Sequence, residues 1–404
     1  MRRKKSSKEN IILIALITGI CLMTDSMLYI ALPLYWREVG LTSLAEVGIL
    51  LSVNRLIRIP LNPLAALLTR NLSIRSALLL AISVTTFVNV GFFYLDGFLF
   101  WFILRCIWGF IWAILRISGQ LLVVHLSSDS DKGTLMGVYN GTYRLGSLIG
   151  MGAGGLLCFE VGLKTTSLIF ACVCLLAIPF VFLLSYTSFA EKQDARKEKF
   201  SLLRNPGVQV TLIRGFSVSF LLQGVFASTV SYYMAKHYGL FLNVNGMEFS
   251  AGVAAGLLLG LRWAWEPLLA PKIGEMSDGK RGRHSILLFA LLITAGLYPF
   301  IDSQLPFFIW GFFIVVILIC STVITTLTDT LFSDEISTHP SKAPMVTCYS
   351  IAVDLGAALG PLLAFQFISE GKHFLLFCAG LALCLAWMSY KQNIKQNTGS
   401  AVTT

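Results

Sequence analysis

Charged residues are scarce in this chain. Asp, Glu, Lys and Arg make up 13% of its 404 residues, whereas 56% are hydrophobic and the mean hydropathy is +0.76. A soluble domain of this length needs far more charge to cover the apolar side chains that its core cannot hold. The composition therefore excludes an ordinary soluble protein and indicates a chain whose outer surface is in contact with lipid.

Metal and redox motifs are missing as well. None of the nine cysteines forms C-x-x-C, and all of them fall in apolar runs. The five histidines lie in loops or at the edges of those runs, without H-E-x-x-H. A G-x-G-x-x-G match at 150–155 stands inside an apolar run with no strand before it, which argues against a dinucleotide site. We therefore expect no disulfide framework, no zinc site and no cofactor.

What the sequence does have is a long series of apolar runs. Most are long enough to cross a hydrocarbon core of about 30 Å at 1.5 Å per residue. The first carries Asp25 and Pro33 and shows no clear cleavage site, so we interpret it as a retained helix and not a signal peptide. The pattern predicts an all-α membrane protein with twelve transmembrane helices, near 11–35, 44–69, 76–95, 98–124, 135–159, 166–187, 208–233, 249–271, 285–301, 305–328, 346–369 and 374–390.

The distribution of Lys and Arg predicts the orientation. With both termini in the cytoplasm, the cytoplasmic segments hold twenty of the 31 basic residues and the opposite side holds four. This positive-inside bias favours a multi-pass protein of the cell membrane, either inner or plasma membrane. It also accounts for the net charge of +10, so the basic balance indicates contact with lipid and does not require nucleic acid.

The chain divides into two similar parts. A charged connection at 188–207 separates six spans in 1–187 from six in 208–404. Arg58-x-x-x-Asn62-Pro-Leu-x-Ala in the second span recurs as Arg262-x-x-x-Glu266-Pro-Leu-x-Ala in the eighth. Gly146-x-x-x-Gly150 in the fifth span recurs as Gly356-x-x-x-Gly360 in the eleventh. Two matches at similar offsets predict two six-helix halves around a midplane site, which is a known plan for transporters.

Three segments carry a family resemblance. PKIGEMSDGKRGR at 271–283 resembles the cytoplasmic loop motif of the major facilitator superfamily. Arg105-x-x-x-Gly109 resembles that superfamily's motif in the fourth span. Gly137, Gly146, Gly150 and Gly154-Gly155 follow the spacing of the motif found in its twelve-helix drug/proton antiporters, with methionine at 151 in place of the motif's proline.

The resemblance implies roles in gating. In the family, an acid in the loop motif caps a helix start and holds the inner gate shut, which suits a carboxylate beside exposed N–H groups. Asp278 stands at that place, whereas the corresponding loop of the first half has Arg70, so any latch is one-sided. The residues expected to act in gating are Gly274, Asp278, Arg283, Gly146, Gly150, Gly360 and Pro361.

Arginines at membrane depth are the main candidates for substrate binding. A charge at the centre of a span costs about 2.5–3.5 kcal/mol even on lenient scales, so these side chains must face protein or water. Arg105, Trp108, Trp112 and Arg116 share one face of the fourth span and predict a stripe that lines a cavity. Arg55 and Arg58 share a face of the second span. Arg262 and Glu266 form either a structural bridge within the eighth span or a substrate contact.

Only three acids lie deep in the predicted spans: Asp25, Glu266 and Asp354. Asp25 is the first candidate for carrying a coupled proton, because a carboxyl group holds a proton in apolar surroundings and releases it beside a cation. A permanent ion pair with a nearby arginine is an equal alternative for this residue. Asp354 is the second candidate for proton coupling.

These observations predict a monomeric secondary transporter that couples proton flow to the efflux of a small organic molecule. The excess of deep arginines favours a cargo that bears a carboxylate, such as a chelator or siderophore-like compound or a drug. One alternative is an uptake symporter for an organic anion. Another is a membrane-embedded enzyme, which the missing nucleophile, base and metal constellations disfavour. We therefore expect no enzymatic activity.

Overall fold

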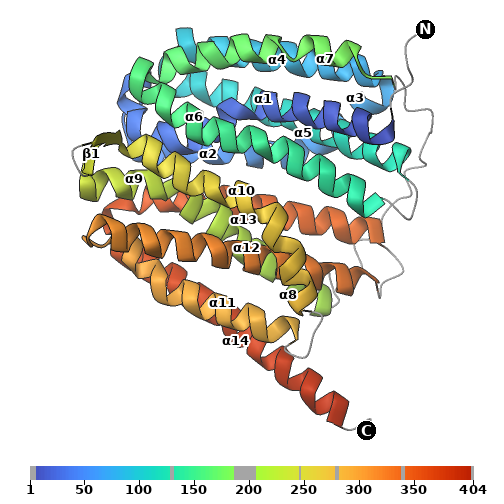
Figure 1. The fold of residues 1–404 in the computed structure, drawn as a ribbon, viewed down its shortest axis with the longest axis vertical. Coiled ribbons are helices and arrows are strands. Elements are labelled where there is room, and N and C mark those ends of the chain that lie inside the picture. Colours follow the sequence, from blue (N-terminus) through green and yellow to red (C-terminus); the bar gives the residue numbers. More distant parts are fainter. Residues whose placement is uncertain are drawn as a thin grey trace. The chain divides into compact units, whose positions relative to one another are not determined.

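The structure is a computed structural model that describes residues 6–127, 132–185, 206–244, 247–277, 282–337 and 342–401. The chain forms two compact units. Unit 1 comprises Met1–Ala195 and Leu240–Ala264, and unit 2 comprises Arg196–Gly239 and Trp265–Thr404. Both consist mainly of long helices (Figure 1).

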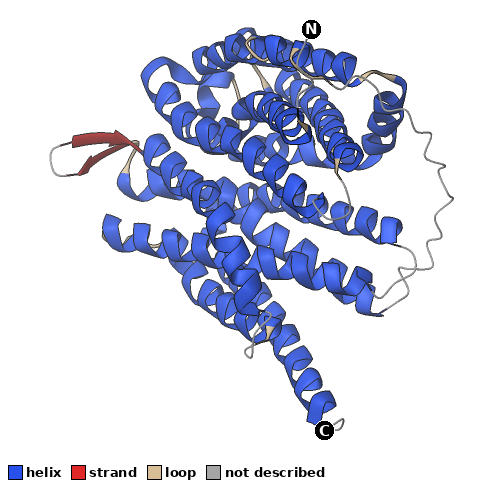
Figure 2. Ribbon diagram, turned by 45° about the vertical axis from the view of Figure 1, so that its right-hand side comes forward, coloured by secondary structure: helices blue, strands red, loops and turns tan. Residues whose placement is uncertain are grey.

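Unit 1 contains the helices of the N-terminal part of the chain. They are α1 (Ser7–Tyr35), the 3-10 helix η1 (Trp36–Val39), α2 (Leu44–Leu56), α3 (Arg58–Asn71), α4 (Ile74–Tyr94), α5 (Phe98–Leu126), α6 (Lys132–Leu175) and α7 (Ile178–Phe182). A two-stranded antiparallel hairpin of β1 (Phe241–Val244) and β2 (Met247–Ser250) follows later in the chain (Figure 2). The sequence did not predict this hairpin. Unit 1 also takes the first part of α10 (Ala251–Ser277).

Unit 2 contains the remaining elements. They are α8 (Pro206–Val218), the π-helix η3 (Ser219–Phe226), α9 (Ala227–Tyr238), the last part of α10, α11 (Arg283–Leu297), the 3-10 helix η4 (Tyr298–Asp302), α12 (Phe307–Ser337), α13 (Lys342–Gln366), the 3-10 helix η5 (Ile368–Glu370) and α14 (Gly371–Ala401). Elements α8, η3 and α9 run on as a single span.

Within the described ranges, nine helices are long and apolar enough to cross a membrane, or ten when the two parts of α10 are taken together. The difference from twelve has a local cause at two places. Gly162, with φ of 82°, breaks α6 where two spans were predicted. The predicted span 44–69 is divided at Ile57 into α2 and α3, because Pro60 in the first turn of α3 has no N–H to continue the earlier helix. With these two corrections the twelve-helix, two-half prediction is confirmed.

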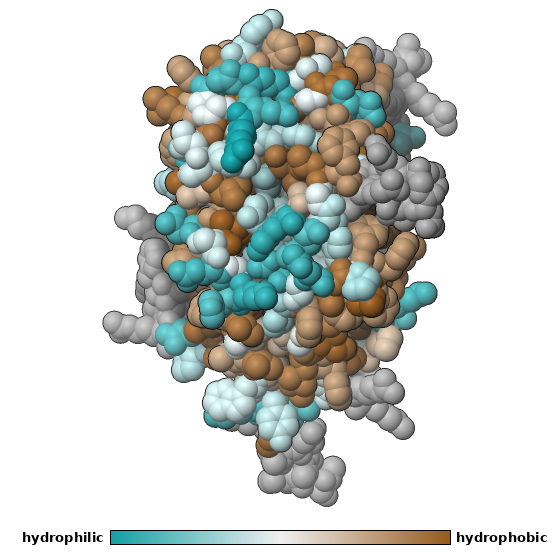
Figure 3. All heavy atoms as spheres, turned by 90° about the vertical axis from the view of Figure 1, so that its left-hand side faces the viewer, coloured by the Kyte–Doolittle hydropathy of each residue, from teal (hydrophilic) through white to brown (hydrophobic). Residues whose placement is uncertain are grey.

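The surface of the molecule is that of a protein surrounded by lipid. Large apolar side chains stand exposed on many helices; Phe87 is 63% exposed, Leu268 70% and Phe308 70%. On the face drawn in Figure 3, hydrophilic side chains gather in patches with hydrophobic ones around them. Water does not tolerate so large an apolar area on a monomer, whereas hydrocarbon does.

Candidate functional site

A buried ion pair lies in unit 1, where α1, α2 and α5 meet. Arg105 on α5 makes an ion pair through its Nη1 with Oδ1 of Asp25 on α1. The Nε of Arg105 also donates a 2.8 Å hydrogen bond to the backbone carbonyl of Leu50 on α2. The Arg105 side chain has no exposed surface, whereas that of Asp25 is 14% exposed. The arginine is thus held by backbone and carboxylate together, and its Nη2 has no hydrogen-bond partner in the described ranges.

Asn54 completes this cluster, and the sequence reasoning missed it. Its side-chain amide donates a 3.0 Å hydrogen bond to Oδ1 of Asp25. Asn54 is buried on α2, one turn after Leu50. A buried carboxylate needs such donors, because an unsatisfied charge away from water is costly. Asp25 and Arg105 were both predicted as site residues, and the structure brings them together with Asn54.

An aromatic row follows the ion pair along α5 and α6. The ring centroids of Trp108 and Trp112 lie 6.2 Å apart, those of Trp112 and Tyr143 5.9 Å, and those of Tyr139 and Tyr143 5.2 Å. Trp108 and Tyr139 are buried, whereas Trp112 and Tyr143 are half-buried. Arg116, also half-buried, lies close enough to Tyr139 to act on it electrostatically. The row offers flat apolar surface next to guanidinium groups.

The other deep arginines of unit 1 also have partners. Arg55 donates from Nε to the Tyr29 hydroxyl at 3.1 Å, and Arg58, which is buried, donates from Nε to the Asn54 carbonyl at 3.1 Å. Arg144 and Arg262 both lie over the ring of Trp263, at 5.1 Å and 5.3 Å from its centroid. Glu266 lies in the last part of α10, which belongs to unit 2.

Glycines hold helices in backbone contact in both units. A Cβ on Gly146 would meet the carbonyl of Gly19, and one on Gly150 would meet the carbonyl of Met23, so α6 lies directly against α1 (Figure 1). In unit 2, Cβ atoms on Gly356 and Gly360 would meet the backbone of Phe216 and Gly224. Small residues at four-residue spacing permit such close packing of helices. Pro361 lies within α13 beside this contact.

The same stretch of α6 also packs against the first part of α10 within unit 1. A Cβ on Gly256 would meet the carbonyl of Met151, and one on Gly155 would meet the carbonyl of Gly252 at 2.7 Å. The segment that matches the antiporter motif is therefore in backbone contact with two helices on different sides.

The remaining predicted gating and coupling residues lie in unit 2. Asp354 is buried on α13, 7% exposed. Gly274, near the end of α10, has nothing within 4 Å of a Cβ that would be added to it. Arg283, at the start of α11, makes an ion pair with Asp334 on α12. Asp278 lies outside the described residues.

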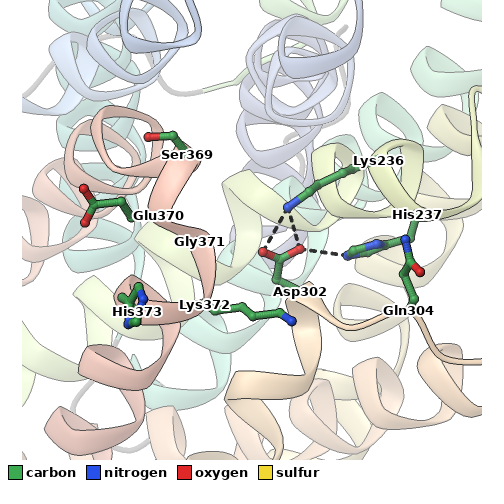
Figure 4. A pocket seen from close by; sticks show the side chains of 9 residues that line it. All are labelled: Lys236, His237, Asp302, Gln304, Ser369, Glu370, Gly371, Lys372 and His373. Atoms are coloured by element: carbon green, nitrogen blue, oxygen red, sulfur yellow. Dashed lines mark hydrogen bonds and ion pairs between the residues drawn. The ribbon is translucent and has the colours of Figure 1, made fainter.

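A polar cavity of about 590 Å³ opens in unit 2 where α9 ends and α14 begins (Figure 4). Lys236, His237 and Asp302 form an ion-pair cluster on its wall. The sequence reasoning placed these residues in loops or at membrane edges and gave them no role. The signal that could have found them is the adjacent Lys236-His237 at the end of one predicted span, with Asp302 at the end of another span on the same side of the membrane.

The sequence and the fold can be compared with known proteins. The profile described as Major Facilitator Superfamily matches residues 14–361. The chain belongs to the major facilitator superfamily. No curated protein matches the sequence significantly.

Solved structures of other members share the superfamily fold. A POT family transporter in complex with 5-aminolevulinic acid is 12% identical, with a TM-score of 0.73 over 94% of each chain. The nucleoside transporter NupG is 14% identical, with a TM-score of 0.72 over 96% of this chain and 99% of its own. A bacterial homologue of the human lysosomal transporter Spinster, inward-facing and unoccupied, is 14% identical, with a TM-score of 0.73 over 99% and 95%. At these identities the likeness concerns the fold alone.

Membership of the superfamily makes this chain a multi-pass membrane transporter. The predicted resemblance is confirmed at the level of the superfamily.

Proposed function

We propose that this transporter exports a small organic molecule in exchange for protons, and that Asp25 carries the proton. The observation that supports the proposal most directly is the buried pair of Asp25 with Arg105. Asp25 is the partly exposed member of the pair and Arg105 the fully buried one, so a proton can reach the carboxylate without unburying the arginine.

Protonation of Asp25 changes the energy of the cluster strongly. A neutral carboxyl group no longer balances Arg105, which then stands as a buried charge held by the Leu50 carbonyl. Removing one partner of a buried ion pair typically costs about 3–5 kcal/mol of stability. A second arrangement of the helices that brings water or cargo to Arg105 removes this cost. Proton binding can therefore select between two states of the transporter.

The charge of the cargo decides whether cargo and proton move in opposite directions or together. A cationic group that binds Asp25 competes with the proton, so the two cross the membrane in opposite directions. A carboxylate that binds Arg105 displaces Asp25, and the displaced carboxyl group then takes up a proton more readily. In that case cargo and proton bind together. Linkage is reciprocal, so each cargo affects proton binding as the proton affects cargo binding.

Export by exchange therefore favours a cargo with a positive group. A zwitterion has that group and also the carboxylate that the excess of deep arginines favours. Its amine competes with the proton at Asp25, while the neighbouring Arg105, whose Nη2 has no hydrogen-bond partner in the described ranges, can receive its carboxylate. The POT family relative that binds 5-aminolevulinic acid provides an example of such a molecule on the same fold. The aromatic row of Trp108, Trp112 and Tyr143 offers a stacking surface for the rest of the cargo.

The second candidate function is uptake of an organic anion together with protons. The ion pair of Arg105 with Asp25 favours this symport for a cargo that carries only a carboxylate. Such a cargo can bind Arg105 only when Asp25 is protonated and releases the arginine. For either function we propose a monomer in the cell membrane with both termini in the cytoplasm, which the positive-inside bias supports.

The test uses protein in lipid vesicles and three matched compounds. These are 5-aminolevulinic acid (zwitterion), its methyl ester (cation) and levulinic acid (anion). If exchange is correct, vesicles acidic inside accumulate the zwitterion or the cation. Accumulation of levulinate in vesicles acidic outside selects symport instead. Vesicles without protein correct for passive distribution of weak acids and bases. Proton coupling is contradicted if the native protein transports these compounds at the same rate with either direction of the pH gradient.

A further inference from the structure

The cavity of unit 2 is built around a buried carboxylate. Asp302, at the end of η4, is 5% exposed, and its two oxygens lie 2.7 Å and 3.0 Å from Nζ of Lys236. Its Oδ1 also lies 2.9 Å from Nε2 of His237. Asp302 therefore already has a cation and an imidazole, and it cannot neutralise a further positive charge in the cavity.

Gly371 holds the start of α14 close to this cluster. A Cβ on Gly371 would lie 2.6 Å from Oδ2 of Asp302 and 2.8 Å from the hydroxyl of Tyr233, which is closer than side chains tolerate. The absence of a side chain at this position thus brings the first turn of α14, with Lys372, to the cavity. The positive end of the helix dipole comes with it.

Lys372 supplies a positive charge that Asp302 does not balance. Its ammonium group extends toward the side of Asp302, whereas Glu370 and His373 lie on the other side of the α14 start (Figure 4). It acts electrostatically on His237. In the described ranges Lys372 has no ion-pair or hydrogen-bond partner. Beside Asp302 there are thus two lysines for one carboxylate, while Glu370, the other acid that lines the cavity, lies on the far side of the α14 start.

His237 gives an independent sign that the cluster is incomplete. Its side chain is 5% exposed, and its Nδ1 makes no hydrogen bond to any described residue. Buried polar atoms are almost always paired, so an unpaired imidazole nitrogen in the wall of a polar cavity indicates a missing partner. Because Nε2 faces the Asp302 carboxylate and carries the proton, Nδ1 of the neutral imidazole is an acceptor, and a water ordered by a ligand or a protonated phosphate oxygen can supply the missing donor.

We propose that this cavity binds a small oxyanion, a carboxylate or a phosphate, between Lys372 and Lys236. Lys236 is 40% exposed, so it can keep its contact with Asp302 and still donate to a ligand. The volume of about 590 Å³ accommodates a small organic acid and lies within the usual range for ligand sites. The site is distinct from the Asp25 cluster of unit 1, and its occupancy does not depend on the direction or coupling of transport.

The oxyanion can come from two sources. The cavity lies at the ends of spans, where lipid headgroups and dissolved anions are both within reach. The shared chemistry is an anionic oxygen group held by two ammonium groups. A soluble ligand acts in any lipid, whereas a headgroup acts only when anionic lipid is present, and this difference separates the sources.

The experiment uses purified full-length protein in nanodiscs of phosphatidylcholine. Inorganic phosphate and citrate are titrated at constant ionic strength while the melting temperature is recorded, and the protein is also placed in nanodiscs that contain phosphatidylglycerol. We expect a saturable rise in melting temperature with citrate or phosphate, or a rise with phosphatidylglycerol. Lys372→Ala should weaken the effect about tenfold, the loss expected for one charge contact, and Lys372→Arg should restore it.

Lys164→Ala is the matched control, because it removes a lysine paired with Asp96 in unit 1. It should leave the titration unchanged. A rise with the soluble anions identifies a dissolved ligand, and a rise with phosphatidylglycerol alone identifies a headgroup. The proposal is overturned if no anion raises the melting temperature, or if Lys372→Ala and Lys164→Ala behave alike. Asp302→Asn gives a second test when it folds, since removal of the competing carboxylate should strengthen anion binding.

Discussion

Asn54 donates a hydrogen bond to the same oxygen of Asp25 that is paired with Arg105. One carboxylate oxygen thus receives an amide and a guanidinium, from helices α2 and α5. Protonation of this carboxylate removes the negative charge to which both donors point. Asn54 and Arg105 are therefore expected to respond together when Asp25 is protonated.

We predict that Asp25→Asn abolishes transport driven by a pH gradient and weakens the binding of a cargo with a positive group. The asparagine has the same shape, but it can neither exchange a proton nor pair with an ammonium group. Gradient-driven accumulation in vesicles should fall at least tenfold, and any cargo binding that the purified protein retains should no longer depend on pH. Asp354→Asn is the matched control on α13. If it loses the gradient response and Asp25→Asn keeps it, the coupling site is Asp354.

We predict that Arg105→Lys retains part of the activity that Arg105→Ala loses. Lysine restores the charge beside Asp25, but it cannot pair with the carboxylate and the Leu50 carbonyl in the same fork geometry. Transport and the melting temperature of the two variants should be measured together. Arg58→Lys serves as a control for a buried arginine that donates to a backbone carbonyl. Normal transport by Arg105→Ala would show that the pair with Asp25 is dispensable.

We predict that Gly150→Ala destabilises unit 1. The new Cβ would meet the carbonyl of Met23, so α6 must move away from α1. Overpacking of this kind typically costs about 1–3 kcal/mol. Gly137→Ala is the control on the same helix, because a Cβ there meets nothing within 4 Å. Thermal unfolding in nanodiscs should separate the two variants, and equal melting temperatures would contradict the close contact.

We predict that Asp278→Asn lowers transport without lowering the amount of folded protein in the membrane. The family motif implies that this acid stabilises one gate state, and asparagine carries no charge to do so. The comparison variant is Asp334→Asn, which breaks the exposed ion pair with Arg283. Exposed pairs contribute little, so this variant should transport almost normally. Full transport by Asp278→Asn at normal expression would contradict the proposed role of Asp278 in holding the gate shut.

Hydropathy was sufficient to predict the spans, because lipid demands long apolar runs whatever their partners. It did not predict the break at Ile57, where a single proline decides whether a span is one helix or two. The hairpin of β1 and β2 was missed because its strands are short and follow a helix end directly. The π-helix η3 was also missed, because no pattern used in reading the sequence distinguishes a π-helical segment from the α-helix around it.

The sequence predicted which charged residues belong to the site, but it did not predict which of them contact each other. Asp25 and Arg105 were singled out because charges inside a membrane are costly, but they are 80 residues apart and sequence alone does not show which helices touch. Asn54 carries no charge, so no rule of membrane energetics pointed to it. Asp302 and Lys236 were passed over because residues at span ends are usually solvated; only the fold shows that Asp302 is buried.

The backbone contact between α1 and α6 has a consequence for how such a protein can change over generations. Gly19, Gly146 and Gly150 join the two helices through their backbones, so this contact does not depend on the shape of any side chain at those three positions. A lineage can thus acquire a new cargo by altering residues around Asp25 and Trp112, while three positions without side chains preserve the frame that it inherited.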